Sequence, residues 1–237
     1  MPRSAPLYPS PPYLYQGNRQ ISVTFRTTLQ ALQGLIPPPL VPNPQSRLFI
    51  YVAQFHVVAP FALNYMEAGI GVPASLSDTA GQYAVYLYLD KATAIVPGRE
   101  IYGWPKKDAE ISITDETEDV SAKVVRDGVM LIEATVKRSV RVDPIPKQPS
   151  APWFNLKLIP SVKKDAPPDV MQLTSTLTGG ETKELYTGSA ALKFGSSAAD
   201  PLGDIPIVEI LGGSYSISDL TLGYGDVIYD YLGEGEP

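Results

Sequence analysis

The sequence predicts an α+β protein made mostly of antiparallel β-sheet, barrel-like and with few helices. Its 24 prolines among 237 residues divide the chain into short segments. Most of these segments alternate apolar and polar residues, as strands do, and only one shows clear helical spacing. Neither an internal repeat nor a break in composition divides the chain, so we expect one domain over residues 1–237.

The N-terminal quarter contains an arm, a strand and the predicted helix. Residues 1–12 are rich in Pro and Ser and lack an apolar core, so we expect an extended arm and not a signal peptide. Residues 21–25 alternate as a strand does. Over residues 29–36, Leu and Ile recur at helical spacing, and Thr27 or Thr28 can cap this helix. The three prolines that follow end it.

The remainder of the chain reads as strands separated by turns. Asp127-Gly128 is a strong hairpin signal between two of them. In the segment 82–89, alternation predicts that Tyr83, Val85, Leu87 and Leu89 share one face and that Tyr86 and Tyr88 lie on the other. The predicted strands are 48–58, 82–89, 123–125, 129–136, 156–159, 170–177, 185–194 and 207–220, with Pro-rich connectors at 141–152 and 160–169.

Composition excludes several classes of function. The chain has no cysteine, which excludes disulfides, thiolate catalysis and Cys-based zinc sites. It has one histidine, His56, so acid–base chemistry falls to Lys, Glu, Asp or Tyr. A net charge of −6 argues against a nucleic-acid partner, and no apolar run is long enough to cross a membrane. We expect a cytoplasmic protein.

The most informative segment for chemistry is 98–107, where two adjacent lysines follow Trp104 and Pro105. Lysine is mostly a surface residue. Either both ammonium groups reach water, or one lies in a pocket where it loses its proton and becomes a nucleophile. The composition leaves both interpretations open.

The chain resembles the acetoacetate decarboxylase family through motifs spread along nearly its whole length. Each motif alone is weak, but their order and spacing are specific. The motifs are Asn18-Arg19, Phe25-Arg26-Thr27, Pro37-Pro38-Pro39-Leu40, Tyr65-Met66-Glu67-Ala68-Gly69, Val72-Pro73, Gly81-Gln82-Tyr83, Tyr88-Leu89-Asp90, Gly98-Arg99-Glu100, Pro105-Lys106-Lys107, Leu156-Lys157-Leu158-Ile159-Pro160, Pro201-Leu202-Gly203-Asp204-Ile205-Pro206 and Val227-Ile228-Tyr229-Asp230-Tyr231-Leu232.

The resemblance implies a β-barrel core, a homo-oligomer and no metal or organic cofactor. Acetoacetate decarboxylase is itself a standard example of an enzyme with an activated lysine. By resemblance, Lys106 is the Schiff-base lysine and Lys107 its cationic neighbour. Glu67 is the catalytic-site carboxylate, and Arg19 is the arginine that positions it.

An amine attacks a ketone only when it is unprotonated. With the ordinary lysine pKa of about 10.4, only about 0.04% of lysine amines are neutral at pH 7. Burial and a nearby cation both disfavour the charged form. Neighbours on a strand point to opposite faces, so we expect Lys107 to point away from Lys106. Burial is then expected to supply the larger share of the lowering of the Lys106 pKa. The apolar walls of the pocket around Lys106 are expected to come from Trp104, Tyr102 and the strand 83–88.

The sequence departs from the family pattern in two places. Ile50 aligns with the family's second acidic residue, and Tyr51 lies beside it in the sequence. Ile50 and Tyr51 are both expected near the substrate. The segment between His56 and Glu67 is longer and more apolar. Tyr51 offers a phenol for dehydration but fits a packing role better. His56 fits a structural role better than a catalytic one.

These observations favour a Schiff-base lyase that decarboxylates a small 3-oxo acid, most simply acetoacetate to acetone and CO₂. The alternative is a Schiff-base aldolase-dehydratase, or another relative that processes keto acids, acting on pyruvate plus an aldehyde. A third hypothesis is a non-catalytic binding barrel, against which the retained Lys106, Lys107, Glu67 and Arg19 argue. A small keto acid is the expected partner.

Overall fold

The computed structural model describes residues 4–115, 117–147 and 150–233, and its strands form two sheets. The large sheet contains β1 (Tyr13–Arg26), β2 (Val41–Pro42), β3 (Arg47–Ala59), β4 (Leu63–Leu76), β5 (Thr79–Leu89), β6 (Lys106–Asp108), β10 (Val140–Arg141), β11 (Trp153–Ile159), β12 (Val170–Thr176), β13 (Thr178–Gly188), β15 (Glu209–Leu222) and β16 (Asp226–Asp230). The small sheet contains β7 (Glu110–Thr114), β8 (Asp119–Arg126), β9 (Val129–Lys137) and β14 (Ala190–Phe194). The helical elements are α1 (Leu29–Leu35), α2 (Ala92–Pro97), a π-helical turn (Gly98–Tyr102) and a 3₁₀ turn (Leu202–Asp204).

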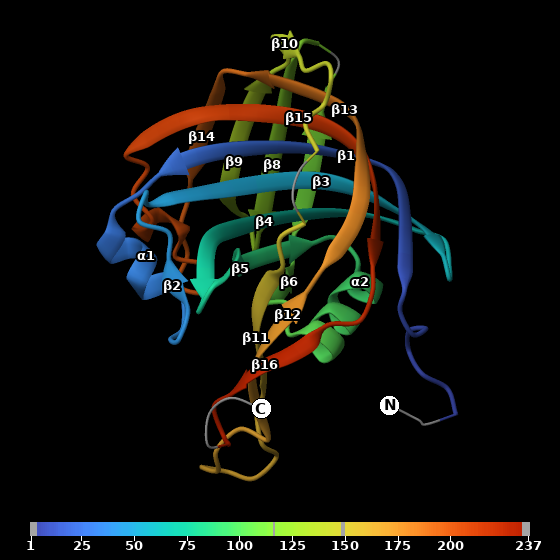
Figure 1. Ribbon diagram of the computed structural model, residues 1–237, viewed down its shortest axis with the longest axis vertical. Coiled ribbons are helices and arrows are strands. Elements are labelled where there is room, and N and C mark those ends of the chain that lie inside the picture. Colours follow the sequence, from blue (N-terminus) through green and yellow to red (C-terminus); the bar gives the residue numbers. More distant parts are fainter. Residues whose placement is uncertain (1–3, 116, 148–149, 234–237) are drawn as a thin grey trace.

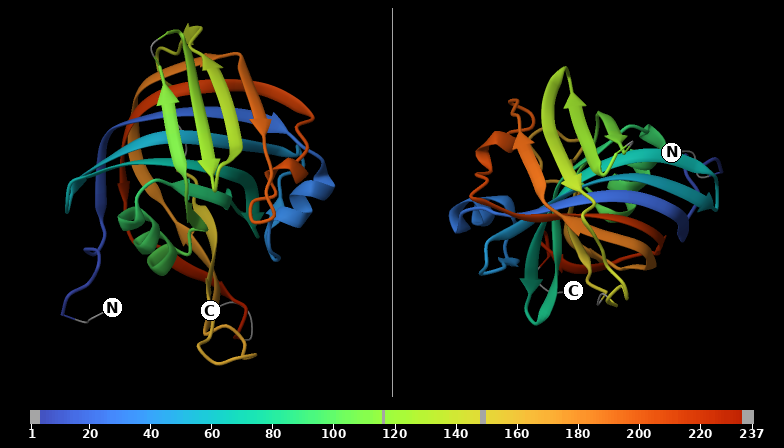
Figure 2. Two further views of the ribbon diagram at one scale, coloured as in Figure 1. Left: turned by 180° about the vertical axis from the view of Figure 1, so that it is seen from behind. Right: turned by 90° about the horizontal axis from the view of Figure 1, so that it is seen from above.

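The large sheet is curled and largely antiparallel, which confirms the predicted fold class (Figure 1). Its strands follow the order β10-β13-β15-β1-β3-β4-β5-β11-β12-β16, with β2 beside β4 and β6 beside β5. The pairs β5–β6 and β5–β11 are parallel. Within the described residues no strand pairing joins β10 to β16, so the sheet is barrel-like without being closed. The small sheet stands across one face of the large one (Figure 2).

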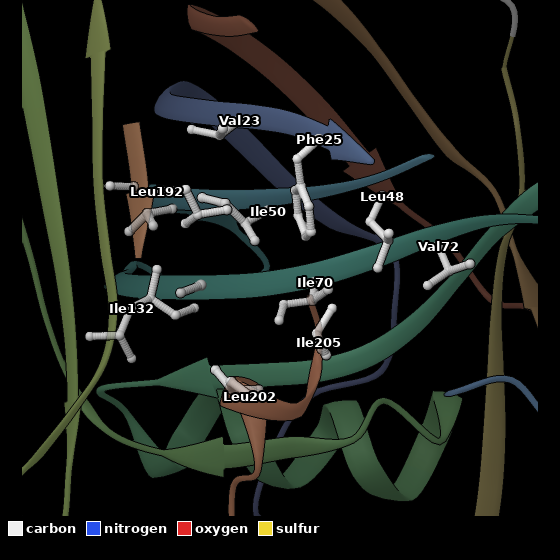
Figure 3. Close-up of a cluster of buried hydrophobic side chains, with 14 of the residues drawn as sticks. Val23, Phe25, Leu48, Ile50, Ile70, Val72, Ile132, Leu192, Leu202 and Ile205 are labelled. Atoms are coloured by element: carbon white, nitrogen blue, oxygen red, sulfur yellow. The ribbon is translucent and has the colours of Figure 1, made fainter. Parts of the chain in front are cut away.

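The main core lies between the two sheets and beneath the 3₁₀ turn (Figure 3). Apolar side chains from alternate positions of β1, β3 and β4 meet residues of β9, β14 and the 3₁₀ turn there. The second face of the large sheet carries a separate, aromatic-rich cluster that packs against α2. One face of the sheet therefore stabilises the fold, and the other is available to form a cavity. No helix of the described residues has both the length and the apolar character needed to cross a bilayer.

Local sequence signals explain several of these elements. Thr28 caps α1, with its Oγ1 accepting a hydrogen bond from the Ala31 N–H at 3.2 Å. Asp127 and Gly128 both adopt positive φ, 50° and 76°, as a two-residue hairpin turn requires. The predicted strands all form, most of them longer than expected. Of the predicted N-terminal arm, residues 4–12 precede β1, and residues 1–3 lie outside the described chain.

The strand β4 was not among the predicted strands. It contains Gly69, Gly71 and Pro73, residue types that are depleted in strands. The structure gives these glycines a packing role: a Cβ atom on Gly69 would lie 2.5 Å from Cε1 of the Tyr51 ring. The glycine thus makes room for an aromatic side chain on the neighbouring strand β3.

The predicted faces of β5 are wrong in part. Tyr86 pairs with Ile70 and Ala84 with Gly71, so Val85 forms a bulge that changes the alternation. Tyr83 therefore joins Tyr86 and Tyr88 on the main-core side, and Ala84, Leu87 and Leu89 face the second cluster. The predicted strand 185–194 is also two strands, because the chain leaves the large sheet after Gly188 and enters the small one at Ala190.

Candidate active site

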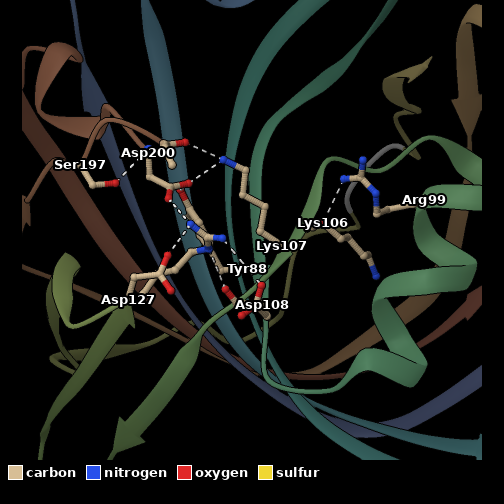
Figure 4. Close-up of polar contacts among 10 residues, drawn as sticks. Tyr88, Arg99, Lys106, Lys107, Asp108, Asp127, Ser197 and Asp200 are labelled. Carbon is tan, nitrogen blue, oxygen red and sulfur yellow. Dashed lines mark hydrogen bonds and ion pairs between the residues drawn. The ribbon is translucent and has the colours of Figure 1, made fainter. Parts of the chain in front are cut away.

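The two adjacent lysines of β6 point to opposite sides of the strand (Figure 4). Lys106 is buried on the side of the aromatic cluster, with 9% of its surface exposed. Lys107 faces the other side, where its Nζ donates to the carbonyl of Ala199 at 2.7 Å and to Oδ1 of Asp200 at 2.8 Å. This confirms the expectation from strand alternation. Lys107 therefore does not lie in the cavity with Lys106.

The turn before β6 fixes where the Lys106 side chain runs. The Arg99 guanidinium donates to the Lys106 carbonyl at 3.0 Å (Figure 4). The hydrocarbon stem of Lys106 passes directly over Gly98, where an added Cβ would lie 2.5 Å from Cδ and 2.6 Å from Cε. Gly103 ends the π-helical turn with a φ of 78°, which suits glycine. The backbone at Gly98 thus packs directly against the lysine stem.

Glu67 faces Lys106 inside the cavity. Its Oε2 lies 3.1 Å from Lys106 Nζ, and the two side chains are 8% and 9% exposed. Lys106 Nζ also donates to the carbonyl of Ala94 at 3.3 Å. The second carboxylate oxygen, Oε1, accepts a hydrogen bond from Tyr51 at 2.6 Å. Burial, together with the neighbouring Glu67 carboxylate, raises the pKa of Tyr51 well above its usual range, so its phenol remains a donor at neutral pH.

Aromatic rings surround this lysine–glutamate pair. Lys106 Nζ lies 5.8 Å from the centre of the Tyr65 ring, whose hydroxyl donates to that of Tyr15 at 3.4 Å. Burial raises the pKa of both tyrosines, so both stay neutral. Trp104 completes the wall and packs against Trp153 with ring centres 5.4 Å apart. The strand 83–88 contributes Ala84 and Leu87 to this cluster, whereas its three tyrosines lie on the main-core side.

Two connected hollows meet at Lys106. One is a wide groove of about 1070 Å³, which Glu67, Tyr51 and Trp153 also line. The other is a pocket of about 30 Å³ beside α2, which is lined by Tyr102, Tyr13, Phe61, Thr93 and aliphatic side chains. Trp104 borders both hollows, as do Tyr15, Tyr65 and Leu222. The predicted contacts Trp104, Tyr102 and Tyr51 therefore all lie at the cavity.

Arg19 does not meet Glu67, which corrects the predicted pairing. Its guanidinium donates to Oδ2 of Asp115 at 2.5 Å and to Oε1 of Gln54 at 2.9 Å. Glu67 pairs in register with Ala53, the residue next to Gln54. Because successive residues of a strand point to opposite faces, the Arg19–Gln54 contact and Glu67 lie on opposite faces of the sheet.

Ile50 is also misplaced by the sequence prediction. Its side chain is fully buried in the main core, between the sheets, and not at the cavity (Figure 3). The neighbouring Tyr51 faces the cavity instead. The single histidine has a structural contact, as expected: Nδ1 of His56 lies 3.1 Å from the carbonyl oxygen of Gly17.

Sequence reasoning gave no role to three residues that shape the site. Gly98 carries the lysine stem, Tyr65 forms the ring beside the ammonium group, and Asp200 holds Lys107 on the far side of β6. Gly98 and Tyr65 belong to the motifs that resemble the family, which was the available signal. Nothing local marks Asp200, because it lies 93 residues from its partner.

Replacing Gly98 by Ala is expected to lower kcat/KM by about 100-fold, because displacement of a reacting group by about 1 Å costs roughly this much. The new Cβ would lie 3.1 Å from Nζ and still closer to the stem, so the lysine must move. Steady-state rates with a 3-oxo acid measure the effect. Gly34→Ala is the matched control, since a Cβ there meets nothing within 4 Å. Equal rates for Gly98→Ala and wild type would contradict the claim that the contact with Gly98 fixes the position of the Lys106 side chain.

A curled, largely antiparallel sheet that buries a lysine–carboxylate pair in an aromatic cavity defines the acetoacetate decarboxylase-like class. The family model described as acetoacetate decarboxylase matches residues 1–232. The acetoacetate decarboxylase of Burkholderia vietnamiensis is 31% identical over 240 residues, covering 99% of this chain and 95% of that protein. The chain belongs to the acetoacetate decarboxylase family, which is a family of carboxy-lyases.

Solved structures show the same fold. The crystal structure of acetoacetate decarboxylase from Legionella pneumophila has a TM-score of 0.89 and 28% identity, covering 98% of this chain and 93% of that one. The enduracididine biosynthesis enzyme MppR, in complex with the condensation product of pyruvate and imidazole 4-carboxaldehyde, has a TM-score of 0.83 and 19% identity. The match covers 96% of this chain and 93% of the MppR chain, and it shows a likeness of fold.

Proposed function

We propose that this chain decarboxylates a small 3-oxo acid through an imine formed on Lys106, with acetoacetate as the simplest substrate and acetone and CO₂ as products. The observation that carries the proposal is the burial of Lys106 Nζ in an aromatic cavity, 3.1 Å from Glu67 Oε2. A buried amine beside a proton acceptor is what a carbonyl-attacking lysine needs.

Glu67 takes the proton that Lys106 must lose before it attacks. Burying two charges costs several kcal/mol per ion, and moving the proton from Nζ to Oε2 removes both charges at once. The Tyr51 hydroxyl donates a hydrogen bond to Oε1 of Glu67. Among the described residues, Oε2 has no partner besides Lys106, with which it forms an ion pair. Tyr51 thus orients the carboxylate so that Oε2 faces the amine.

The reaction begins with the neutral amine of Lys106. The neutral amine adds to the ketone carbon, and Glu67 returns its proton as water leaves, which gives the protonated imine. The bond between the α-carbon and the carboxylate breaks, CO₂ leaves, and the electron pair forms an enamine. Glu67 takes up a second proton from water and delivers it to the enamine carbon. Water then hydrolyses the protonated imine, which releases the ketone and the ammonium form of Lys106.

The size of the groove supports a second candidate function. About 1070 Å³ is far more than acetoacetate fills, and the same enamine can attack an aldehyde held there. Condensation of pyruvate with an aldehyde is therefore the alternative activity of the same lysine. Ile50 does not bear on the choice between the two activities, since its side chain lies in the main core.

Two assays on one preparation test the proposal. We expect acetone release from acetoacetate, above the spontaneous rate, to exceed the formation of conjugated product from pyruvate and an aromatic aldehyde. A preparation that forms the conjugated product and releases no acetone would favour the alternative. A preparation that does neither would leave the non-catalytic hypothesis standing.

A further inference from the structure

The small pocket beside Lys106 bears on which 3-oxo acid the enzyme takes. A ketone bound to Nζ as an imine carries two arms on the same carbon: the arm with the carboxylate, and an alkyl arm. Lys106 lies where the groove and the small pocket meet, so the two arms have two different places to go.

The small pocket suits an apolar arm. Val57, Leu63, Phe61 and Leu222 form its sides, and Lys106 is the one charged residue among those that line it in the described chain. Its tyrosine hydroxyls are largely engaged within the protein. Tyr102 donates to the carbonyl of Gly223 at 2.9 Å, and Tyr13 to that of Pro9 at 2.6 Å. A carboxylate placed there would lose its hydration for few donors in return, the Thr93 hydroxyl among them, which is costly.

The groove suits the charged arm. Its lining includes the polar Gln20 and Gln82 and the cationic Lys147. It also includes the carboxylates of Glu181 and Asp219, the second of which pairs with Lys183. The groove is wide enough to retain water around a substrate carboxylate. The carboxylate therefore points into the groove, and the alkyl arm enters the pocket.

The pocket is larger than a methyl group. Its volume is about 30 Å³. One water molecule needs about 10–15 Å³, so the pocket has room beyond a single small group. Acetoacetate, whose alkyl arm is one methyl group, leaves part of this apolar space unused.

We infer that this enzyme prefers a 3-oxo acid whose ketone carries an ethyl or propyl group in place of methyl, with that chain held in the pocket formed by Val57, Phe61 and Leu63. The inference rests on the proposed function. Phe61 is held at the pocket by an edge-to-face contact with Tyr13, with ring centres 6.3 Å apart, so the pocket has a defined end.

The test compares decarboxylation of acetoacetate, 3-oxopentanoate, 3-oxohexanoate and 3-oxooctanoate, each corrected for its spontaneous rate. We expect kcat/KM to rise about fourfold with each added methylene up to propyl, as burial of that much apolar surface predicts. We expect it to fall for the pentyl chain of 3-oxooctanoate. A kcat/KM that is highest for acetoacetate would overturn the inference.

Two substitutions with opposite expected effects connect the preference to this pocket. Val57→Phe fills it, so the ratio of kcat/KM for 3-oxohexanoate to that for acetoacetate should fall by about tenfold or more. Phe61→Ala opens its end and should move the optimum to the longer chain. Val58→Phe is the control, because the exposed Val58 side chain does not line the pocket. Unchanged ratios in Val57→Phe and Phe61→Ala would overturn the inference.

Trapping experiments separate failure of this inference from failure of the proposed function. Borohydride reduction with each 3-oxo acid should give an adduct on Lys106. Adducts without any dependence of rate on chain length overturn only the chain-length preference. The absence of an adduct with every acid overturns the proposed function, and the inference with it.

Discussion

Borohydride reduction in the presence of acetoacetate is expected to inactivate the enzyme and to add one isopropyl group to Lys106. The isopropyl group is what remains when the acetone imine, formed after CO₂ has left, accepts hydride. The buried amine beside Glu67 is the basis of this expectation. Peptide mapping by mass spectrometry locates the adduct.

Lys106→Met should remove the adduct and lower kcat by about 10⁴-fold or more, as loss of a covalent nucleophile does. Methionine retains most of the stem that packs over Gly98, so the melting temperature serves to check that the variant folds. Lys107→Met is the matched control: its ammonium group binds Asp200 on the other side of β6, so trapping at residue 106 should persist. An adduct that maps to Lys107 would contradict the assignment.

Asp200→Asn is expected to lower the free energy of unfolding at pH 7 by about 3 kcal/mol, the cost of breaking a buried ion pair. The Asp200 carboxylate is fully buried and accepts from Lys107 at 2.8 Å, Tyr88 at 3.0 Å and Arg126 at 2.8 Å. These bonds join β6, β5 and β8 to the segment that carries the 3₁₀ turn. Urea unfolding measures the change, and Asp204→Asn, at a nearby exposed position, is the control.

The effect of Asp200→Asn should depend on pH. Burial opposes ionisation of Asp200, but hydrogen bonds from Lys107, Tyr88 and Arg126 outweigh it and lower the pKa of the carboxyl below its ordinary value. A carboxyl whose pKa is lowered by folding stabilises the protein above its unfolded-state pKa, about 3.9. That contribution is lost as the pH falls through the folded-state value. The difference between wild type and Asp200→Asn should therefore shrink below about pH 4, and a constant difference would contradict this account.

The local elements of the fold are encoded in short stretches of sequence. The Thr28 cap, the Asp127-Gly128 turn and the opposite directions of Lys106 and Lys107 each depend on a few adjacent residues and were predicted correctly. Motifs that resemble the family identified Glu67 as well. Its hydrogen bond with Tyr51, 16 residues away, comes from the pairing of β3 with β4, which the sequence did not reveal because β4 was not predicted.

Tertiary structure decided which residues share a face. A shift of one residue moves every side chain of a strand to the other side of the sheet, so one unpredicted bulge, at Val85, was enough to turn Tyr83 away from the cavity. In the same way, strand register determines that Arg19 contacts Asp115 and Gln54. It also determines that the Ile50 side chain lies in the main core. By itself the sequence determined many of the strands, the Asp127-Gly128 turn and the direction of the two lysines of β6. The partners of Lys107 and Arg19, and the pocket beside Lys106, depend on contacts between segments distant in sequence, which arise only when the sheet is assembled.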